Sequence, residues 1–371
     1  MNIRAGFLSL FGLSFVINCA AVAATFAQYP GFDEIRAGLS DSLPSSEDRE
    51  LLRQHRPILH VPEGEEGPID FYDDYVGSGD LFDGEGVHLA HDPDEAALNA
   101  VRDMPEAVFV HHPTTEANPA GYGSVVRATL TLSGGAETFT FLGYHFVFRH
   151  SGLPAGVSPL YLRLADIFAD SADWHQLDHY TAAFVVLREN TPFAVILQQH
   201  NHMRTYFMRD EPSFADGQIL LDVALSSNEL YPHREGKVRR RTAGDMNAKT
   251  TPYLTGQSES GGWRASDDIT VGGREVEYAL KFLPPDDAFY VFQGRLGEPR
   301  RLPGRNGPPG AIYRTLPKLW HLQTALYVFY WTDDDPEYAQ ILEDEGISDT
   351  AMKEYLRRFE SVFYQHVSPR N

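Results

Sequence analysis

The feature that most constrains the fold is a series of short segments, rich in Val, Ile, Phe, Tyr and Thr, that fills the middle of the chain. Each segment is bounded by Gly, Pro, Asn or Asp, and this combination is typical of β-strands separated by turns. Strands joined by short connections pair antiparallel, so we expect antiparallel sheets. The segments cover residues 107–112, 124–133, 138–150, 180–187, 192–207, 219–226, 275–282 and 288–293.

Two connections carry specific turn signals. Residues 133–136, Ser-Gly-Gly-Ala, separate two alternating segments and are a strong hairpin signal. Residues 189–192, Glu-Asn-Thr-Pro, mark the next turn. Many short strands with such turns predict a mostly β fold, with antiparallel sheets packed in a β-sandwich-like arrangement. Short helices are expected before this region, at residues 46–54 and 95–102.

Helical patterns return only at the end of the chain. Three aspartates at 333–335 precede Pro336, which suits the acidic first turn of a helix. After Ser348, apolar residues recur at helical spacing. We therefore predict a C-terminal helical pair over residues 333–371, packed on a β-sandwich-like domain of residues 28–332.

The first 27 residues have the organisation of a secretory signal peptide. Arg4 precedes an uncharged apolar stretch over residues 5–16, and small residues follow as far as Ala27. We predict cleavage near Ala27 and a secreted or periplasmic protein, with a retained membrane anchor as the alternative. Cys19 is the only cysteine, so the mature chain would contain no disulfide. No later segment is apolar for long enough to cross a bilayer as a helix.

The net charge of the chain limits the classes of molecule that it is expected to bind. The formal net charge of -21 argues against nucleic acid and anionic lipid as partners. One basic cluster, formed by Lys237, Arg239, Arg240 and Arg241, is interpreted as a solvated loop, although it could hold an anionic ligand.

A glycine-rich acidic run over residues 63–85 predicts a long surface loop. Its Asp80, Asp83 and Glu85 have the donor type for calcium, but their spacing matches no calcium loop. We therefore interpret them as solvated acidic residues.

The predicted strand over residues 192–207 carries the first candidate site. Side chains alternate along a strand, so one face would present Gln198, His200, His202, Arg204 and Tyr206. Two histidines at this spacing can share a divalent metal. In a catalytic interpretation, His202 or Tyr206 would be the general base and Arg204 would bind a substrate carboxylate. The alternative is an ordinary solvated sheet face.

Asp178 extends this candidate site. The short turn after residues 180–187 brings the preceding segment beside the strand of residues 192–207, so Asp178 could lie near His200. Asp178, His200 and His202 would then form a three-ligand metal site with an open position. His145 and His150 point to opposite faces of their strand, so at most one of them can join.

Several motifs resemble the vacuolar protein sorting-associated protein sixty-two family. They occur in the family's order from Arg56 to Trp320, and the family's residues are replaced at His179, Tyr180, Asn228 and Leu296. The matching segments are Arg-Pro-Ile-Leu-His-Val at residues 56–61, Tyr-His-Phe-Val-Phe at 144–148, His-Gln-Leu-Asp-His-Tyr at 175–180, Gln-His-Asn at 199–201, Ser-Asn-Glu-Leu-Tyr-Pro at 227–232, Gly-Arg-Leu-Gly at 294–297 and Gly-Pro-Pro-Gly at 307–310.

This resemblance supports the fold more than a function, because the family has no well-defined biochemical activity. More distantly, residues 175–180 are similar to a motif of necrosis-inducing secreted toxins. In those proteins the motif binds a divalent metal on a β-sandwich, and Tyr180 stands here where that motif has glutamate.

Together these observations predict an exported soluble protein that binds a small or glycan ligand. A divalent metal is the candidate cofactor, and no other cofactor is indicated. One alternative is a lyase or hydrolase acting on an acidic polysaccharide, and another is a structural envelope protein without a site. The sequence does not decide between an enzyme and a binding protein, and it does not indicate an oligomeric state.

Overall fold

The computed structural model of the protein describes residues 43–112, 117–132, 135–151, 155–156, 175–199, 202–208, 213–215, 217–240, 268–284 and 286–296. Within these residues the fold is mostly β, as predicted, with a few short helices. None of the helices described there is long and apolar enough to cross a membrane. The predicted signal peptide of residues 1–27 and the C-terminal helical pair of residues 333–371 lie outside the described residues, so both stay predictions.

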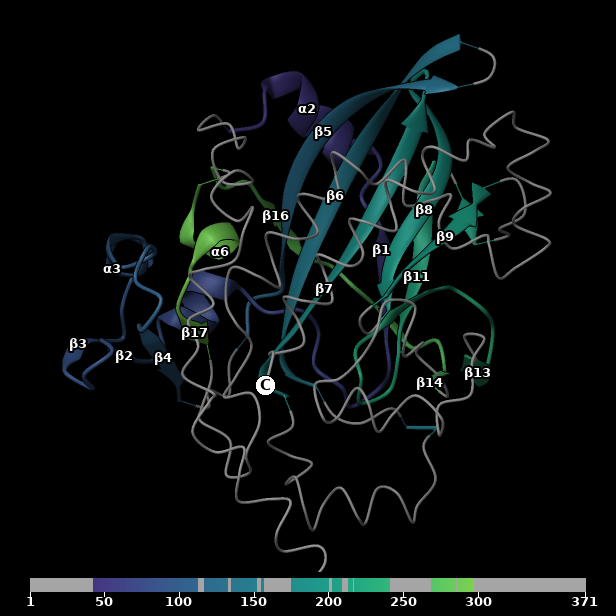
Figure 1. Ribbon diagram of the computed structural model, residues 1–371. Coiled ribbons are helices and arrows are strands. Elements are labelled where there is room, and N and C mark those ends of the chain that lie inside the picture. The colour runs from purple at the N-terminus through teal and green to yellow at the C-terminus, as the bar shows by residue number, and fades with distance from the viewer. Residues whose placement is uncertain are drawn as a thin grey trace, which may run out of the picture.

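The largest sheet is built from consecutive hairpins (Figure 1). Its order is β16-β5-β6-β7-β8-β9, and every pair from β5 to β9 is antiparallel. Strand β16 joins at the edge, parallel to β5. The strands are β5, Ala120–Leu132; β6, Gly135–Ser151; β7, His175–Arg188; β8, Thr191–Gln199; β9, His202–Phe207; and β16, Ala279–Lys281.

Both predicted hairpins are confirmed. At the end of the first hairpin, Leu132 of β5 pairs with Gly135 of β6. Between β7 and β8, Glu189 and Asn190 have φ values of 51° and 63°. Two successive residues with positive φ make a type I′ turn, whose twist matches that of the flanking strands.

A second sheet faces the first across the core. Its path is β10-β11-β1-β15, with β12 also paired to β11, and β1 runs parallel to β11. Leu59 and Leu221 from this sheet share one buried cluster with Tyr144 and Leu197 from the large sheet, so the two sheets pack as layers of a sandwich. The strands are β1, Ile58–Val61; β10, Phe214–Ala215; β11, Gln218–Val223; β12, Leu230–Pro232; and β15, Arg274–Val276.

The predicted helix at residues 46–54 is confirmed as α2, Ser46–Gln54. Ser45 and Asp48 form a capping box, in which each side chain accepts a hydrogen bond from the other residue's backbone N–H. Leu52 is fully buried, and its carbonyl accepts a hydrogen bond from the Tyr144 hydroxyl at 2.9 Å. The second predicted helix is present but shorter, as α3, Glu95–Ala100.

A smaller four-stranded sheet lies beside these layers in the order β17-β4-β2-β3 (Figure 1). Its strands are β2, Gly79–Phe82; β3, His88–His91; β4, Val108–His111; and β17, Arg295–Leu296. A separate ribbon pairs β13, Val238–Arg240, with β14, Asp268–Thr270.

The predicted loop over residues 63–85 is wrong in part. It contains the π-helix η2, Phe71–Val76, and strand β2. The side chain of Asp70 caps η2 by accepting from two backbone N–H groups of its first turn, at 3.0 and 3.1 Å. Acidic residues in this run therefore serve helix capping and strand pairing, which the glycine and charge content of the segment does not reveal.

The predicted strand over residues 288–293 is also wrong, because the segment begins with a helix. This helix is α6, Ala288–Val291, and its four residues are fully buried. Asp287 caps it by accepting a hydrogen bond from the Phe289 N–H at 2.8 Å. A short apolar run that is buried on all sides has no periodicity that separates a strand from a helix.

Candidate metal centre

The predicted strand over residues 192–207 is two strands, β8 and β9, that pair with each other. Gln199 of β8 pairs with His202 of β9, so the alternation on which the predicted polar face depended does not run through both strands. Tyr206 is paired with Val195, and it packs against the same hydrophobic cluster as the buried Val195 side chain. Arg204 takes the register position opposite Leu197. Tyr206 therefore contributes to the core and not to a separate polar face.

The predicted ligands fall on neighbouring parts of the large sheet. Asp178 belongs to β7, which pairs with β8 as expected, and His202 begins β9. His200 lies outside the described residues, and the structure does not describe the side chains of Asp178, His202 and Arg204. Their metal-binding and catalytic roles, and that of Tyr206, stay predictions.

The structure brings a different set of ligands together on the small sheet, and we name this set the surface site: Asp80, His88, His91 and His112. Asp80 lies on β2, which pairs with β3 on one side and β4 on the other. His91 is the direct register partner of Asp80, and His112 follows β4. The three strands thus converge on one carboxylate.

A β-bulge explains why His88 joins His91. Residues three apart on a regular strand point to opposite faces. Here the register shifts between Leu81 and Phe82, so that Leu81 pairs with Ala90 and Phe82 pairs with His88. The shift skips one residue of β3 and returns His88 to the face of His91.

The distances around the carboxylate are short. One oxygen of Asp80 lies 2.7 Å from Nε2 of His88 and 2.9 Å from Nδ1 of His91. The other oxygen lies 2.6 Å from Nε2 of His112. The ligand atoms of Asp80, His91 and His112 all lie within 4.8 Å of one another. His88 adds a third imidazole nitrogen, which lies on the same carboxylate oxygen as that of His91.

The charged state of Asp80 and the three histidines is coupled through their hydrogen bonds. Hydrogen bonds from His112, His88 and His91 hold the pKa of the Asp80 carboxyl well below its usual range. In return, the Asp80 carboxylate raises the pKa of His91. The histidine side chains are 48%, 65% and 51% exposed for His88, His91 and His112, so solvent reaches one side of the cluster.

The donor set indicates which ion fits. Imidazole nitrogens with one carboxylate oxygen suit zinc and similar first-row dications, whereas calcium prefers a shell of oxygens. The interpretation of Asp80 as a solvated acidic residue is wrong, because both of its carboxylate oxygens are hydrogen-bonded to histidines. Asp83 has a structural role, since its carboxylate accepts from the N–H groups of Glu85 and Val87 at 2.9 and 2.8 Å. The sequence signal that was missed is the His-x-x-His pair of residues 88–91.

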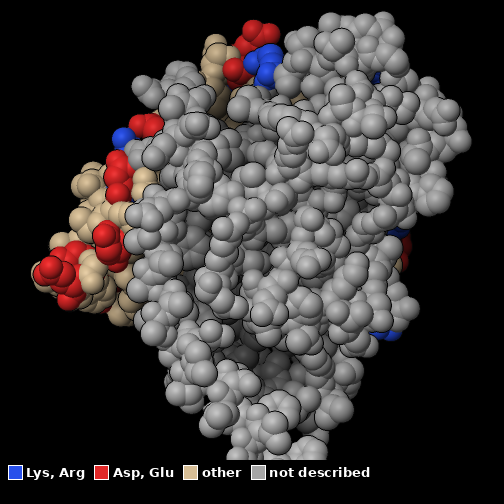
Figure 2. Space-filling view, in the orientation of Figure 1, with Lys and Arg blue, Asp and Glu red and all other residues tan. Residues whose placement is uncertain are grey.

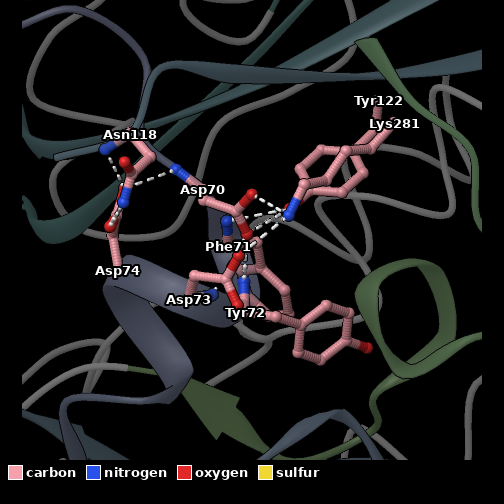
Figure 3. Close-up of polar contacts among 8 residues, drawn as sticks. All are labelled: Asp70, Phe71, Tyr72, Asp73, Asp74, Asn118, Tyr122 and Lys281. Atoms are coloured by element: carbon pink, nitrogen blue, oxygen red, sulfur yellow. Dashed lines mark hydrogen bonds and ion pairs between the residues drawn. The ribbon is translucent and has the colours of Figure 1, made fainter. Parts of the chain in front are cut away.

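A polar network supports the strand that carries Asp80 (Figure 3). Lys281 from β16 forms ion pairs with Asp70, which caps η2, and with Asp73 in its first turn. Asp74 accepts hydrogen bonds from the backbone and side chain of Asn118 at 2.6 and 3.0 Å. These contacts tie η2 to the start of the large sheet. Because η2 ends shortly before β2, they also fix where the small sheet begins.

The acidic residues around the surface site favour the binding of a cation. Figure 2 shows acidic side chains crowded at the end of the molecule where Figure 1 places β2, β3 and β4. The whole chain carries a formal net charge of -21. A field of this sign raises the local concentration of dications near the surface site.

Comparison with known proteins gives a limited result. No family model matches the sequence, and no curated protein matches it. Among solved structures, the chain is similar to NLPPya in complex with mannosamine, at 11% identity and a TM-score of 0.31, over 71% of this chain and 91% of that one. It is similar to NLPPya in complex with glucosamine at 13% identity and a TM-score of 0.28, over 53% and 74%.

A third similar structure is Necrosis and Ethylene inducing Protein 2 from the causal agent of cocoa's Witches Broom disease. Its identity is 13% and its TM-score 0.26, over 53% of this chain and 73% of that one. The predicted resemblance to the vacuolar sorting family is wrong. The similar structures belong to the necrosis-inducing toxins, the more distant of the two groups named from the sequence. Scores this low transfer no function to the present chain.

Proposed function

We propose that this protein binds a zinc-class dication at the surface site and presents it to an oxygen-donor ligand. One observation carries this proposal: two imidazoles from β3 and one from the residue after β4 converge on the Asp80 carboxylate at 2.6–2.9 Å. Zinc binds its ligand atoms at about 2 Å, so atoms that share one zinc ion must lie close to one another. The ligand atoms of Asp80, His91 and His112 meet this condition.

The exposure of the site supports the second half of the proposal. Asp80, His91 and His112, whose ligand atoms lie close enough to share an ion, would leave the fourth position of a tetrahedral zinc on the solvent side for an outside ligand, with His88 as a hydrogen-bond partner of Asp80. Hydroxyl and carboxylate oxygens are suitable donors for such positions. A sugar ligand agrees with the glycan-binding function predicted from the sequence, and glucosamine and mannosamine are practical first probes.

The test is a zinc titration of chelator-treated protein by calorimetry. His112→Ala removes the donor on the second carboxylate oxygen, and we expect the affinity of the surface site to fall by about 100-fold or more, beyond the effect of losing an outer-shell partner. Glu85→Gln is the matched control, because it removes a charge from the neighbouring turn without changing a ligand. It should bind zinc nearly as tightly as the unmodified protein.

Two results would contradict the proposal. The first is a zinc affinity that is the same in His112→Ala and in the unmodified protein. The second concerns the ligand: if glucosamine and mannosamine bind equally well with zinc and with chelator present, the metal does not present the ligand. In that case zinc binding would have a structural purpose only.

A further inference from the structure

A second group of metal-type donors lies on the other sheet, and we name it the inner triad: His60, Asp222 and His233. Strands β1 and β11 pair parallel, with His60 as the register partner of Asp222. His233 follows β12, and its N–H donates to the Leu220 carbonyl at 2.9 Å. Backbone pairing therefore fixes all three positions.

The inner triad is protected from solvent. Asp222 is fully buried, and its Oδ1 lies 2.6 Å from Nδ1 of His233, whose side chain is 17% exposed. The rings of His60 and His233 stack at 4.3 Å with an interplanar angle of 22°. The ligand atoms of the three residues all lie within 4.8 Å of one another.

One atom of the inner triad is unexplained by the protein alone. Nε2 of His60 is buried and has no hydrogen-bond partner among the residues that the structure describes. A buried polar atom without a partner is costly, and such atoms in native proteins usually mark a bound ion, water or function. The nitrogen belongs to the same cluster as a buried carboxylate and a second imidazole, which is a donor set for a metal.

Neighbouring groups orient the carboxylate. Oδ2 of Asp222 accepts from the Arg234 N–H at 3.0 Å and from the Arg240 guanidinium at 3.1 Å. Arg240 is itself held by the Pro232 carbonyl at 2.7 Å and the Thr270 hydroxyl at 2.9 Å. These bonds occupy Oδ2, so Oδ1 faces the histidines. Hydrogen bonds of this kind from residues outside the donor set orient a ligand toward a metal. The interpretation of Arg240 as part of a solvated loop is wrong.

We propose that the inner triad is a second metal site, with two histidines and one carboxylate, for a first-row transition dication. The ion would bind Nε2 of His60, the Asp222 carboxylate and His233, and it would displace the proton held between His233 and Asp222 into solvent. Imidazole donors favour zinc, cobalt or ferrous iron over magnesium and calcium. Arg240 offsets the Asp222 charge, so the ion is held by its nitrogen ligands more than by a negative field.

The experiment separates this site from the surface site. In a variant with His91→Ala and His112→Ala, only the inner triad should bind cobalt(II), with one equivalent, a visible absorption band and a raised Tm. His60→Phe added to this variant keeps the ring stack and deletes the nitrogen. We expect cobalt affinity to fall by about 100-fold or more. With chelator present, the Tm of the His60→Phe protein should be unchanged or higher, because the atom without a partner is gone.

Glu235→Gln is the matched control, since this carboxylate is 98% exposed and lies 3.6 Å from Nε2 of His233. It should leave cobalt affinity nearly unchanged. Absence of cobalt binding in the double variant overturns the inner-triad proposal, as does unchanged affinity in His60→Phe. Either result leaves the zinc titration of the surface site unaffected, so the two proposals fail separately.

A second measurement covers the case in which His60→Phe does not fold. X-ray absorption on the double variant loaded with one equivalent of zinc counts the imidazoles around the ion. Two imidazoles support the inner triad, because His60 and His233 are the ones it provides. One imidazole or none overturns it.

Discussion

Replacing Asp70 by alanine is expected to lower the free energy of unfolding by about 3–5 kcal/mol, as for the loss of one member of a buried charged network. Asp70 is 1% exposed, and it accepts hydrogen bonds from two backbone N–H groups of η2 and from the Tyr122 hydroxyl at 3.0 Å. Burial raises the pKa of Tyr122 well above its usual value, so this hydroxyl remains a donor. Alanine would leave these donors without their acceptor and Lys281 without its buried partner (Figure 3).

Urea unfolding followed by circular dichroism measures this effect. Asp73→Ala is the matched control, because Asp73 also pairs with Lys281 at 3.0 Å but its side chain is 69% exposed. An exposed ion pair contributes up to about 1 kcal/mol, so the control should change stability little. Equal losses in the two variants would show that the network acts only through the charge of Lys281, and that the cap of η2 contributes nothing.

The second large effect is expected for Gly273→Ala, which should destabilise the protein by about 3 kcal/mol or more through steric overlap and backbone strain combined. Gly273 has φ of 134°, in a region that other residues rarely adopt. A Cβ there would lie 2.0 Å from the Val61 carbonyl oxygen and 2.8 Å from the Pro62 nitrogen. Both contacts are to backbone, which cannot rotate away, so β1 and β15 would have to separate.

Gly236→Ala is the control that measures backbone strain without steric overlap. Gly236 has φ of 75°, and a Cβ there would meet nothing within 4 Å. Its substitution should cost about 1–2 kcal/mol, the usual cost of a left-handed conformation. Thermal melts of both variants provide the comparison. If Gly273→Ala is no less stable than Gly236→Ala, the predicted cost of overlap between a Cβ at residue 273 and the backbone of β1 is wrong. Because Val61 follows His60, Gly273→Ala should also disturb the inner triad.

Several elements were predictable because their determinants are local. The cap of α2 lies in Ser45 and Asp48, three residues apart, and the type I′ turn lies in Glu189 and Asn190. His145, named from the sequence only as a possible member of the candidate site, is fully buried, and its Nε2 lies 2.7 Å from the Ser124 hydroxyl on the neighbouring strand of the hairpin. Each of these features depends on neighbours along the chain or directly across a hairpin.

The candidate sites were not predictable in the same way. The surface site depends on a bulge between β2 and β3 that returns His88 to the face of His91, and bulges leave no fixed sequence pattern. The Asp80 carboxylate is also brought to His112 by β4, whose place beside β2 no turn signal specifies. Alternation along residues 192–207 predicted a different site, because it treated the two paired strands β8 and β9 as one strand.

The sequence by itself determined the β-rich fold class, the two hairpins and the cap of α2, because hydrogen bonds between near neighbours and the alternation of side chains decide them. Only the tertiary structure decided which histidines and carboxylates meet. His60 and Asp222 become partners through a parallel pairing of β1 and β11, strands that are far apart in the chain. Such pairing is selected by how the two sheets bury their apolar faces together, and that is a property of the packed molecule as a whole.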